Sequence, residues 1–204
     1  MIKAIAFDLG GVLIDLDMDE CIRRFREEMG FGQITELIDP YHQKGIYRQL
    51  ENGSVDAGGF RRYILERSRP GCTPDMVDAC LHAFVPTMAP SKAEVLTSLH
   101  GRYDLLLLSN NNPICMAHIY DVFRSYGIEH GSFFKAEIIS YREKVMKPSE
   151  GIYRRLVDAA GCRPEEILFL DDSEANVDGA AAVGIKAVLC SPSDDLGELV
   201  EAAL

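Results

Sequence analysis

Short runs of apolar residues recur along the chain, and each run has the length of a buried β-strand. The five runs are Ile2–Phe7, Tyr103–Leu108, Phe134–Ile139, Ile167–Leu170 and Lys186–Leu189. Within most of these runs the apolar residues are nearly continuous. This pattern is typical of strands in a parallel sheet, which helices cover on both faces.

Helical patterns fill the intervals between the last four runs. Two examples are Gly151–Ala160 and Asn176–Ala182, and each is followed by a glycine, Gly161 or Gly184, which is a common signal for the end of a helix. Strands that alternate with helices form right-handed βαβ units. The sequence therefore predicts an α/β fold with a doubly wound parallel sheet.

The segment from Asp17 to Met88 has no strand pattern and shows helical periodicity instead. Turn signals divide this segment into about four helices. The turn signals are Gly30/Gly32, Asn52-Gly53 and Arg69-Pro70-Gly71. Helices inserted after the first strand would lie over the carboxyl edge of the sheet, where they could act as a lid. We therefore expect a catalytic core of residues 1–16 and 89–204 and an inserted helical cap of residues 17–88.

Composition and charge narrow the range of partners. The 204 residues are 47% hydrophobic and carry a formal net charge of −11. Nucleic-acid phosphates are bound by surfaces rich in lysine and arginine, so we expect no nucleic-acid partner. No apolar stretch approaches the ~20 residues that cross a membrane, and no signal-peptide pattern or CxxC pair is found, so we expect a cytoplasmic protein with reduced cysteines and no membrane partner. The sequence leaves open whether the protein is a monomer or a homodimer.

Carboxylates follow two of the predicted strands. Asp8 ends the first apolar run, and Asp171 and Asp172 follow the fourth. Parallel α/β sheets bind ligands at the carboxyl edge of their strands, so we expect the three side chains to meet there. Mg²⁺ prefers carboxylate oxygens, and adjacent carboxylates without a cation repel each other. The sequence thus predicts a Mg²⁺ site, although Asp8 could instead cap a turn and Asp172 or Ser173 could cap the next helix.

Four short motifs contain these and other candidate residues. They are Phe7-Asp8-Leu9-Gly10-Gly11-Val12-Leu13, Leu108-Ser109-Asn110, Met146-Lys147-Pro148 and Phe169-Leu170-Asp171-Asp172-Ser173. In this order they resemble the four motifs of the haloacid dehalogenase-like (HAD) hydrolase superfamily, and the helical segment resembles the cap that follows the first motif. The resemblance spans essentially the whole chain and implies a phosphatase acting on a small phosphorylated metabolite.

The resemblance also implies a role for the acidic residues. Asp8 would attack phosphorus and form an aspartyl-phosphate, which divides a difficult hydrolysis into two easier steps. Mg²⁺ would be bound by Asp8, the Gly10 carbonyl and Asp171. Asp172 would bind the metal directly or hold one of its waters.

The remaining motif residues would hold the phosphoryl group. Gly11 lets the backbone approach the ligand closely, and Ser109 and Asn110 would bind phosphoryl oxygens, although this asparagine-rich stretch could also be an ordinary polar loop. Lys147 would neutralise the phosphoryl charge. Lys144 is a competitor, but no proline follows it.

One position departs from the family pattern. Most phosphatases of the family have a second aspartate two residues after the nucleophile as general acid, and here that residue is Gly10. General acid catalysis contributes typically ~10²–10⁴-fold. The chain would then be inactive, a 2-haloacid dehalogenase, or a phosphatase whose leaving group needs little acid help. The paired aspartates of the fourth motif favour the phosphatase, and Asp15 and Asp17 are alternative acids that are otherwise explained as hinge or capping residues.

Further details resemble one subgroup of the family. The Asp-Leu-Gly-x-Val form of the first motif and the element Glu51-Asn52-Gly53 look like the subgroup that contains α-D-glucose-1-phosphate phosphatases, which implies a sugar phosphate as substrate. Four cap residues are candidate substrate contacts without motif support, namely Tyr41, His42, Tyr47 and Gln49. A competing hypothesis is a phosphate-binding homologue with weak or no turnover, which the intact motif residues disfavour.

Overall fold

A five-stranded parallel sheet forms the centre of the molecule. The computed structural model describes residues 1–38 and 43–204, and its strand order is β3-β2-β1-β4-β5. The strands are β1 (Ala4–Phe7), β2 (Asp104–Ser109), β3 (Ala136–Ile139), β4 (Ile167–Asp171) and β5 (Lys186–Leu189). Each predicted strand is present, with ends that differ from the prediction by at most two residues. The predicted α/β fold with a doubly wound parallel sheet is confirmed.

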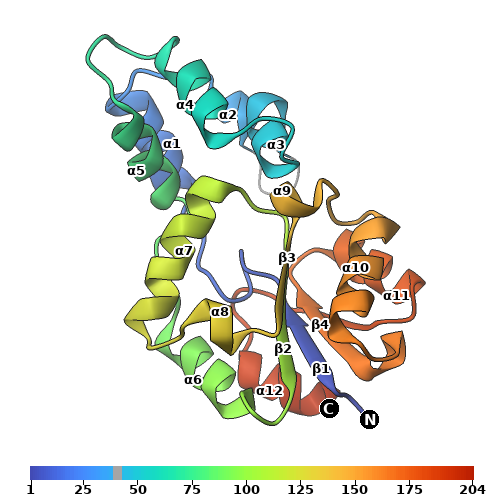
Figure 1. Ribbon diagram of the computed structural model, residues 1–204. Coiled ribbons are helices and arrows are strands. Elements are labelled where there is room, and N and C mark those ends of the chain that lie inside the picture. The colour runs from blue at the N-terminus through green and yellow to red at the C-terminus, as the bar shows by residue number, and fades with distance from the viewer. Residues whose placement is uncertain (39–42) are drawn as a thin grey trace.

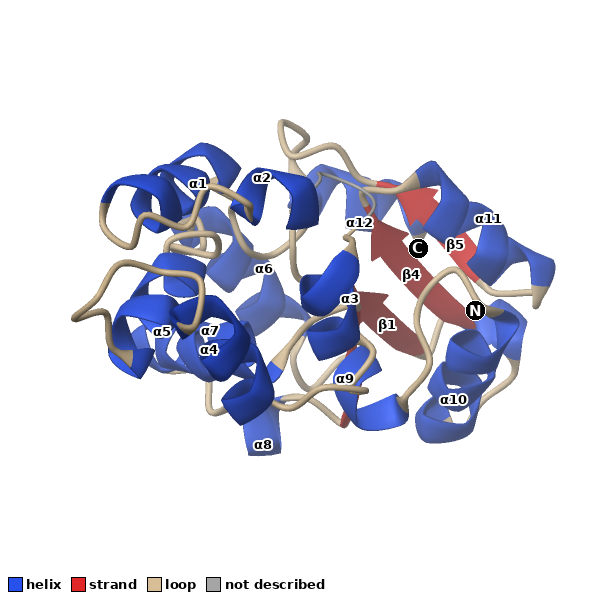
Figure 2. Ribbon diagram, turned by 90° about the horizontal axis from the view of Figure 1, so that it is seen from above, coloured by secondary structure: helices blue, strands red, loops and turns tan. Residues whose placement is uncertain are grey.

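Helices cover both faces of the sheet, because successive side chains of a strand point to opposite sides. Ile5 and Phe7 belong to the hydrophobic cluster that includes helices α6, α7 and α12, whereas Ala4 and Ala6 belong to the cluster that includes α10 and α11. These helices are α6 (Pro90–Leu99), α7 (Pro113–Ser125), α10 (Glu150–Ala160), α11 (Glu174–Ala182) and α12 (Leu196–Ala203). Figure 2 shows α10 and α11 on one side of the strands and α6 on the other.

Five helices lie between β1 and α6 in the described part of this segment. They are α1 (Met18–Glu27), α2 (Ile34–Leu37), α3 (Gly45–Glu51), α4 (Ala57–Leu65) and α5 (Pro74–His82). The prediction of about four helices was low by one, because α2 is only four residues long and too short to show a helical period. The side chains of Asp17, Asp56 and Thr73 accept backbone N–H groups at the starts of α1, α4 and α5, which stabilises these helix ends.

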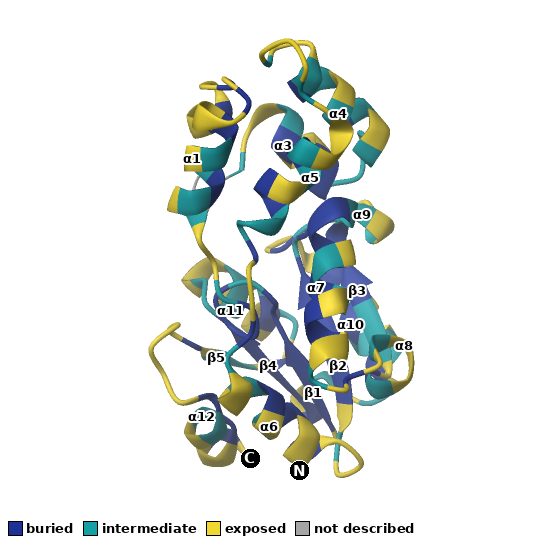
Figure 3. Ribbon diagram, turned by 90° about the vertical axis from the view of Figure 1, so that its left-hand side faces the viewer, coloured by how far each residue is buried: buried dark blue, intermediate teal, exposed yellow. Residues whose placement is uncertain are grey.

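The inserted helices α1–α5 gather at the carboxyl end of the sheet (Figure 1). One hydrophobic cluster nevertheless runs from these helices into the sheet, since Phe25, Tyr47 and Phe60 are buried in the same cluster as Phe7 and Phe123. Figure 3 shows that exposed residues lie along the outer surfaces of α1 and α4, while the central strands β1 and β4 are buried. The division into a core and a cap therefore stays a prediction.

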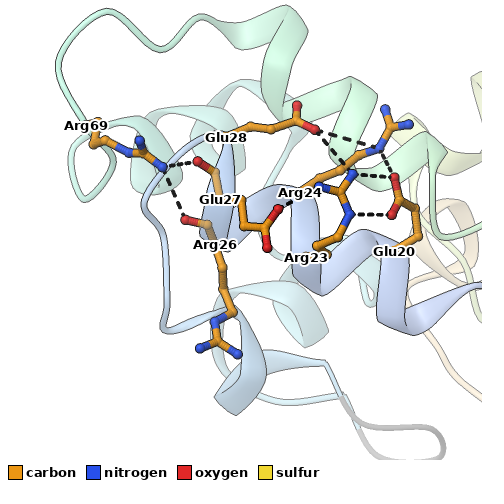
Figure 4. A network of polar contacts seen from close by, with 7 residues as sticks. All are labelled: Glu20, Arg23, Arg24, Arg26, Glu27, Glu28 and Arg69. Atoms are coloured by element: carbon orange, nitrogen blue, oxygen red, sulfur yellow. Dashed lines mark hydrogen bonds and ion pairs between the residues drawn. The ribbon is translucent and has the colours of Figure 1, made fainter.

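Ion pairs cover the outer face of α1 (Figure 4). Arg23 lies 2.7 Å from a carboxylate oxygen of both Glu20 and Glu27. Arg69, in the connection between α4 and α5, donates hydrogen bonds to the carbonyl groups of Arg26 and Glu27. Exposed ion pairs contribute about 0–1 kcal/mol each, so the main role of this network is to attach the α4–α5 connection to the end of α1.

The rest of the chain consists of short connections. These include the helices α8 (His130–Phe133) and α9 (Ser140–Glu143) and the 3₁₀ turn η1 (Pro164–Glu166). All six cysteines are free thiols. Among the described residues, no helix has the length and apolar character needed to cross a membrane.

Candidate active site

The sheet brings the predicted motif residues to one edge. Phe7 of β1 is level with Leu107 of β2 and Leu170 of β4, so the residues that follow these positions emerge together. A cavity of about 670 Å³ opens at this edge. Its lining includes strand-end and loop residues and residues of the inserted helices, among them Asp8, Gly10, Ser109, Asn110, Lys147, Asp172, Tyr47, Arg48 and Glu51.

Asp8 follows β1 and is almost completely buried. Its N–H donates to the Leu170 carbonyl at 2.9 Å, and its Oδ1 accepts the N–H of Leu9 at 2.7 Å. Its Oδ2 lies 2.9 Å from Nζ of Lys147. Burial raises the pKa of Asp8 to about 7, against the opposing charge of Lys147 and with the help of the Asp171 charge. A fully ionised Asp8 at neutral pH therefore calls for more positive charge than Lys147 alone supplies.

Lys147 is the buried cation of the cavity. Its Nζ lies 2.5 Å from Oδ2 of Asp171 and 2.9 Å from Oδ2 of Asp8. Burial lowers its pKa, but the charges of Asp171 and Asp8 outweigh burial and raise the pKa above its ordinary value. The side chain of Asn110 accepts the N–H of Lys147 at 2.9 Å and donates to its carbonyl at 3.0 Å, which fixes the backbone here. The competitor Lys144 points elsewhere, because its Nζ donates to the Gly53 carbonyl at 2.6 Å.

Three carboxyl groups form a cluster that could hold a metal ion. One oxygen from each of Asp8, Asp171 and Asp172 lies within 4.8 Å of the others. Oδ1 of Asp171 accepts the N–H of Ser173 at 2.9 Å and the side-chain amide of Asn176 at 2.8 Å, so this carboxylate is held in one orientation. Burial and the charge of Asp171 raise the pKa of Asp172. Three carboxyl groups against one ammonium group form an oxygen-rich, negatively charged donor set that fits a hard divalent cation.

The two glycines after Asp8 serve different purposes. Gly11 has a φ of +75°, and a Cβ there would lie 2.3 Å from Oδ2 of Asp172, so only glycine fits. Its N–H donates to the Ile14 carbonyl at 2.9 Å, and its predicted contact with phosphate stays a prediction. Gly10 lines the cavity, where a Cβ would lie 3.3 Å from Cδ2 of Leu16. The predicted metal contact of the Gly10 carbonyl also stays a prediction.

The asparagine run after β2 is both a helix cap and a wall of the cavity. Ser109, Asn110 and Asn111 line the cavity. Asn112 caps α7, since its Oδ1 accepts the N–H groups of Ile114 and Cys115 at 3.0 and 2.9 Å. The two interpretations of this stretch, ligand site and ordinary polar loop, are therefore compatible.

The structure places the two alternative acids outside the cavity lining. Asp15 pairs with Lys92 at 3.1 Å, and Asp17 caps α1 by accepting the N–H of Glu20 at 2.9 Å. Among the candidate substrate contacts, Tyr47 lines the cavity, whereas Gln49 is exposed and does not line it. The other two candidates, Tyr41 and His42, lie outside the described residues.

Comparison with known proteins identifies the family. The model of the haloacid dehalogenase-like hydrolases matches residues 2–184. The chain belongs to this family of hydrolases. A D-ribitol-5-phosphate phosphatase of Bacteroides thetaiotaomicron is 30% identical to this HAD-like hydrolase over 178 residues, which are 87% of this chain and 86% of the relative.

Solved structures of HAD-like hydrolases share the fold over nearly the whole chain. A HAD family enzyme from Bacteroides thetaiotaomicron was crystallised as an aspartate-to-alanine variant in complex with magnesium and inorganic phosphate. It superposes with a TM-score of 0.91 at 31% identity, with 98% of this chain and 99% of that chain covered. A HAD-like family hydrolase from Porphyromonas gingivalis superposes with a TM-score of 0.86 at 33% identity, with 99% and 97% covered.

Two charged residues of α3 line the cavity of this HAD-like hydrolase and were not predicted as site residues. Arg48 and Glu51 both come from α3, and Arg48 is exposed whereas Glu51 is buried. Glu51 belongs to the Glu51-Asn52-Gly53 element that resembles one subgroup of the family, so a signal for it existed. Arg48 has no comparable signal, because its place in the cavity depends on how the inserted helices pack on the core.

Proposed function

We propose that this hydrolase is a Mg²⁺-dependent phosphomonoesterase that acts on a small phosphorylated sugar or polyol through an aspartyl-phosphate on Asp8. The observation that carries the proposal is the meeting of the Asp8 carboxyl group, the Lys147 ammonium group and the Asp171-Asp172 pair at one site. Asp8, Lys147 and Asp172 of this group line the cavity. A carboxylate nucleophile beside a buried cation is suited to attack on a charged phosphoryl group.

The acidic cluster would hold the metal. Asp8, Asp171 and Asp172 supply carboxylate oxygens close enough to share one ion, and Mg²⁺ is the ion that suits few carboxylates together with water and phosphate oxygens. When bound, it would neutralise the charge of the phosphoryl group and of the carboxylates. A similar HAD family enzyme crystallised with magnesium and inorganic phosphate supports this choice of ion.

The residues of the chain divide the remaining work. An oxygen of Asp8 bonds to phosphorus while the bond from phosphorus to the ester oxygen breaks, and the ester oxygen takes up a proton and leaves as the alcohol. Water then attacks phosphorus, which releases inorganic phosphate and restores Asp8. Lys147 stabilises the negative charge on the phosphoryl oxygens in both steps. Ser109 and Asn110 orient the phosphoryl group from the end of β2.

The cavity and a relative support the substrate class. A volume of about 670 Å³ lies within the range of ~300–1,000 Å³ that is typical of small-molecule sites. Arg48 adds a positive charge to the wall formed by α3. The relative named as a D-ribitol-5-phosphate phosphatase acts on a polyol phosphate, which has the same chemical character as the hexose phosphates expected from the sequence.

The test is phosphate release from a panel of esters that includes D-ribitol 5-phosphate, α-D-glucose 1-phosphate, glycerol phosphate and 4-nitrophenyl phosphate. We expect release with Mg²⁺, none after chelation, and a loss of more than about 10³-fold in Asp8→Asn, which keeps the shape of the side chain but removes its charge. Phosphate binding without release would favour the non-catalytic homologue. Chloride release from 2-chloropropionate without phosphatase activity would favour the dehalogenase.

A further inference from the structure

One carboxyl group of the cavity has no part in the steps described so far. Among the described residues, four carboxylic side chains line the cavity, and they are Asp8, Glu51, Asp172 and Glu174. Asp8 and Asp172 belong to the acidic cluster, and Glu174 is exposed at the start of α11. Glu51 differs from all of these, since it comes from the inserted helices and only 6% of its surface is exposed.

The carboxyl group of Glu51 is free to face a ligand. Its backbone carbonyl accepts a hydrogen bond from Ser140, but no hydrogen bond or ion pair to its carboxyl group is found among the described residues. Burial and the charge of Asp8 raise the pKa of Glu51 to about 8, against the opposing charges of Arg48 and Lys147. A buried carboxyl group in this setting keeps its proton at neutral pH.

The end of α3 that carries Glu51 is attached firmly to the core. The buried hydroxyl of Ser140 in α9 donates to the Glu51 carbonyl at 2.7 Å and accepts the N–H of Asn111 at 3.0 Å. Two residues further on, Gly53 has a φ of +69°, and a Cβ there would lie 2.2 Å from the carbonyl oxygen of Tyr141. This close approach of two backbones needs glycine, and it gives Glu51 a defined place in the cavity.

We propose that Glu51 is the general acid and base of the hydrolysis, an inference that rests on the proposed phosphatase function. In the first step the carboxyl proton of Glu51 passes to the ester oxygen as its bond to phosphorus breaks, so that a neutral alcohol leaves. In the second step the Glu51 carboxylate takes a proton from the water that attacks phosphorus. The proton count balances, and Glu51 returns to its starting state.

This assignment accounts for the departure at Gly10. No carboxyl group stands at that position, and the side chain of Leu16 lies beside it. Asp15 and Asp17 are engaged by Lys92 and by the N-terminus of α1. Glu51 supplies an acid to the same cavity from a different part of the chain.

The test is the dependence of rate on the leaving group. We would measure kcat/KM of the wild-type protein and Glu51→Gln for 2,4-dinitrophenyl phosphate, 4-nitrophenyl phosphate and a sugar or polyol phosphate. Glu51→Gln should lose about 10²–10⁴-fold on the sugar or polyol phosphate, which needs protonation, and less than about tenfold on the dinitrophenyl ester. The slope of log rate against leaving-group pKa should therefore be steeper in the variant.

The matched control is Glu36→Gln, the same change at an exposed position of α2, which should keep the wild-type slope. Equal losses of Glu51→Gln on all three esters would overturn the proposal and indicate a binding role. A steeper slope in Glu174→Gln but not in Glu51→Gln would also overturn the proposal, because it would identify Glu174 as the general acid. If Glu51→Gln does not fold, the variant to measure is Glu51→Asp, which keeps a carboxyl proton but shortens the side chain. Glu51→Asp should give a slope between those expected for the wild type and for Glu51→Gln. A wild-type slope in Glu51→Asp would overturn the proposal. Failure of the proposed function is a different result, namely a wild-type protein that releases no phosphate from any of the three esters.

Discussion

At the scale of single residues, the site concentrates more carboxyl groups than its cation can neutralise. In the folded protein Asp8 keeps its proton up to about pH 7, whereas the ordinary pKa of an aspartate is 3.8. The folded state thus binds this proton more tightly than the unfolded state, so stability is greatest at low pH and falls as the pH rises from about 4 to about 7. At 1.4 kcal/mol per pKa unit, the full loss is of the order of 4 kcal/mol.

We therefore expect the melting temperature of the metal-free wild-type protein to fall between about pH 5 and pH 7, and that of Asp8→Asn to fall much less. Thermal unfolding in a chelating buffer measures both. Asp19→Asn, at an exposed position of α1, should behave like the wild type. Identical pH dependence in the wild type and Asp8→Asn would show that the buried carboxyl group does not control this property.

A second residue-scale prediction concerns Gly11. Gly11→Ala should cost about 1–2 kcal/mol for the left-handed backbone and should also displace Asp172, because the new Cβ would lie 2.3 Å from its Oδ2. We expect Mg²⁺ affinity to fall at least about tenfold. Gly127→Ala is the matched control, since Gly127 has a similar φ of +73° but a Cβ there would meet no other atom within 4 Å. Titration with Mg²⁺ should separate the two variants, and equal affinities would contradict the account.

At the scale of elements, α3 forms one wall of the cavity. Arg48→Ala should raise KM for sugar or polyol phosphates about 10–100-fold, since a hydrogen bond to a charged group is worth roughly 1.5–3 kcal/mol, and should affect 4-nitrophenyl phosphate less. Gln49→Ala is the control on the same helix, because Gln49 is exposed and does not line the cavity. Steady-state kinetics with both esters gives the comparison. Similar losses in the two variants would argue against a recognition role for Arg48.

The elements also show how far the sequence alone could lead. Buried parallel strands are nearly continuous apolar runs, so the strands and the acids at their ends could be predicted. The helix α2 could not, since four residues show no period. Glu51 could be marked only as part of a resemblance, because its position depends on a hydrogen bond to Ser140, 89 positions away in the chain. Local patterns carry no information about such a contact.

At the scale of the whole molecule, the net charge of −11 opposes the approach of phosphate esters. Salt shortens the range of this repulsion from ~30 Å at 0.01 M to ~10 Å at 0.1 M. We expect kcat/KM to rise by about two- to threefold between these ionic strengths at constant Mg²⁺, with kcat nearly constant. Initial rates at low and saturating substrate measure the two quantities. A fall of kcat/KM with salt would mean that the cations of the cavity, Arg48 and Lys147, dominate the approach.

The hydrophobic cluster shared by the inserted helices and the sheet leads to another whole-molecule prediction. Phe25 and Phe60 are buried in the same cluster as Phe7, so the two parts should unfold together. We expect one cooperative transition, with equal calorimetric and van't Hoff enthalpies. Two separated transitions would instead show that the inserted helices and the sheet unfold independently of each other.

Exchange of inserted helices between relatives is an obvious route to new substrate ranges. The hydrogen bond from Ser140 of the core to the Glu51 carbonyl of α3 limits this route. A transplanted set of helices would have to match Asn112, whose amide lies 3.4 Å from the hydroxyl of Tyr47, as well as the hydroxyl of Ser140. It would also have to bring its own equivalent of Glu51. Recognition and chemistry in this protein are thus not separable modules. Natural or laboratory evolution of its specificity should proceed through single changes on the cavity wall, such as those at Arg48, more readily than through replacement of the whole insert.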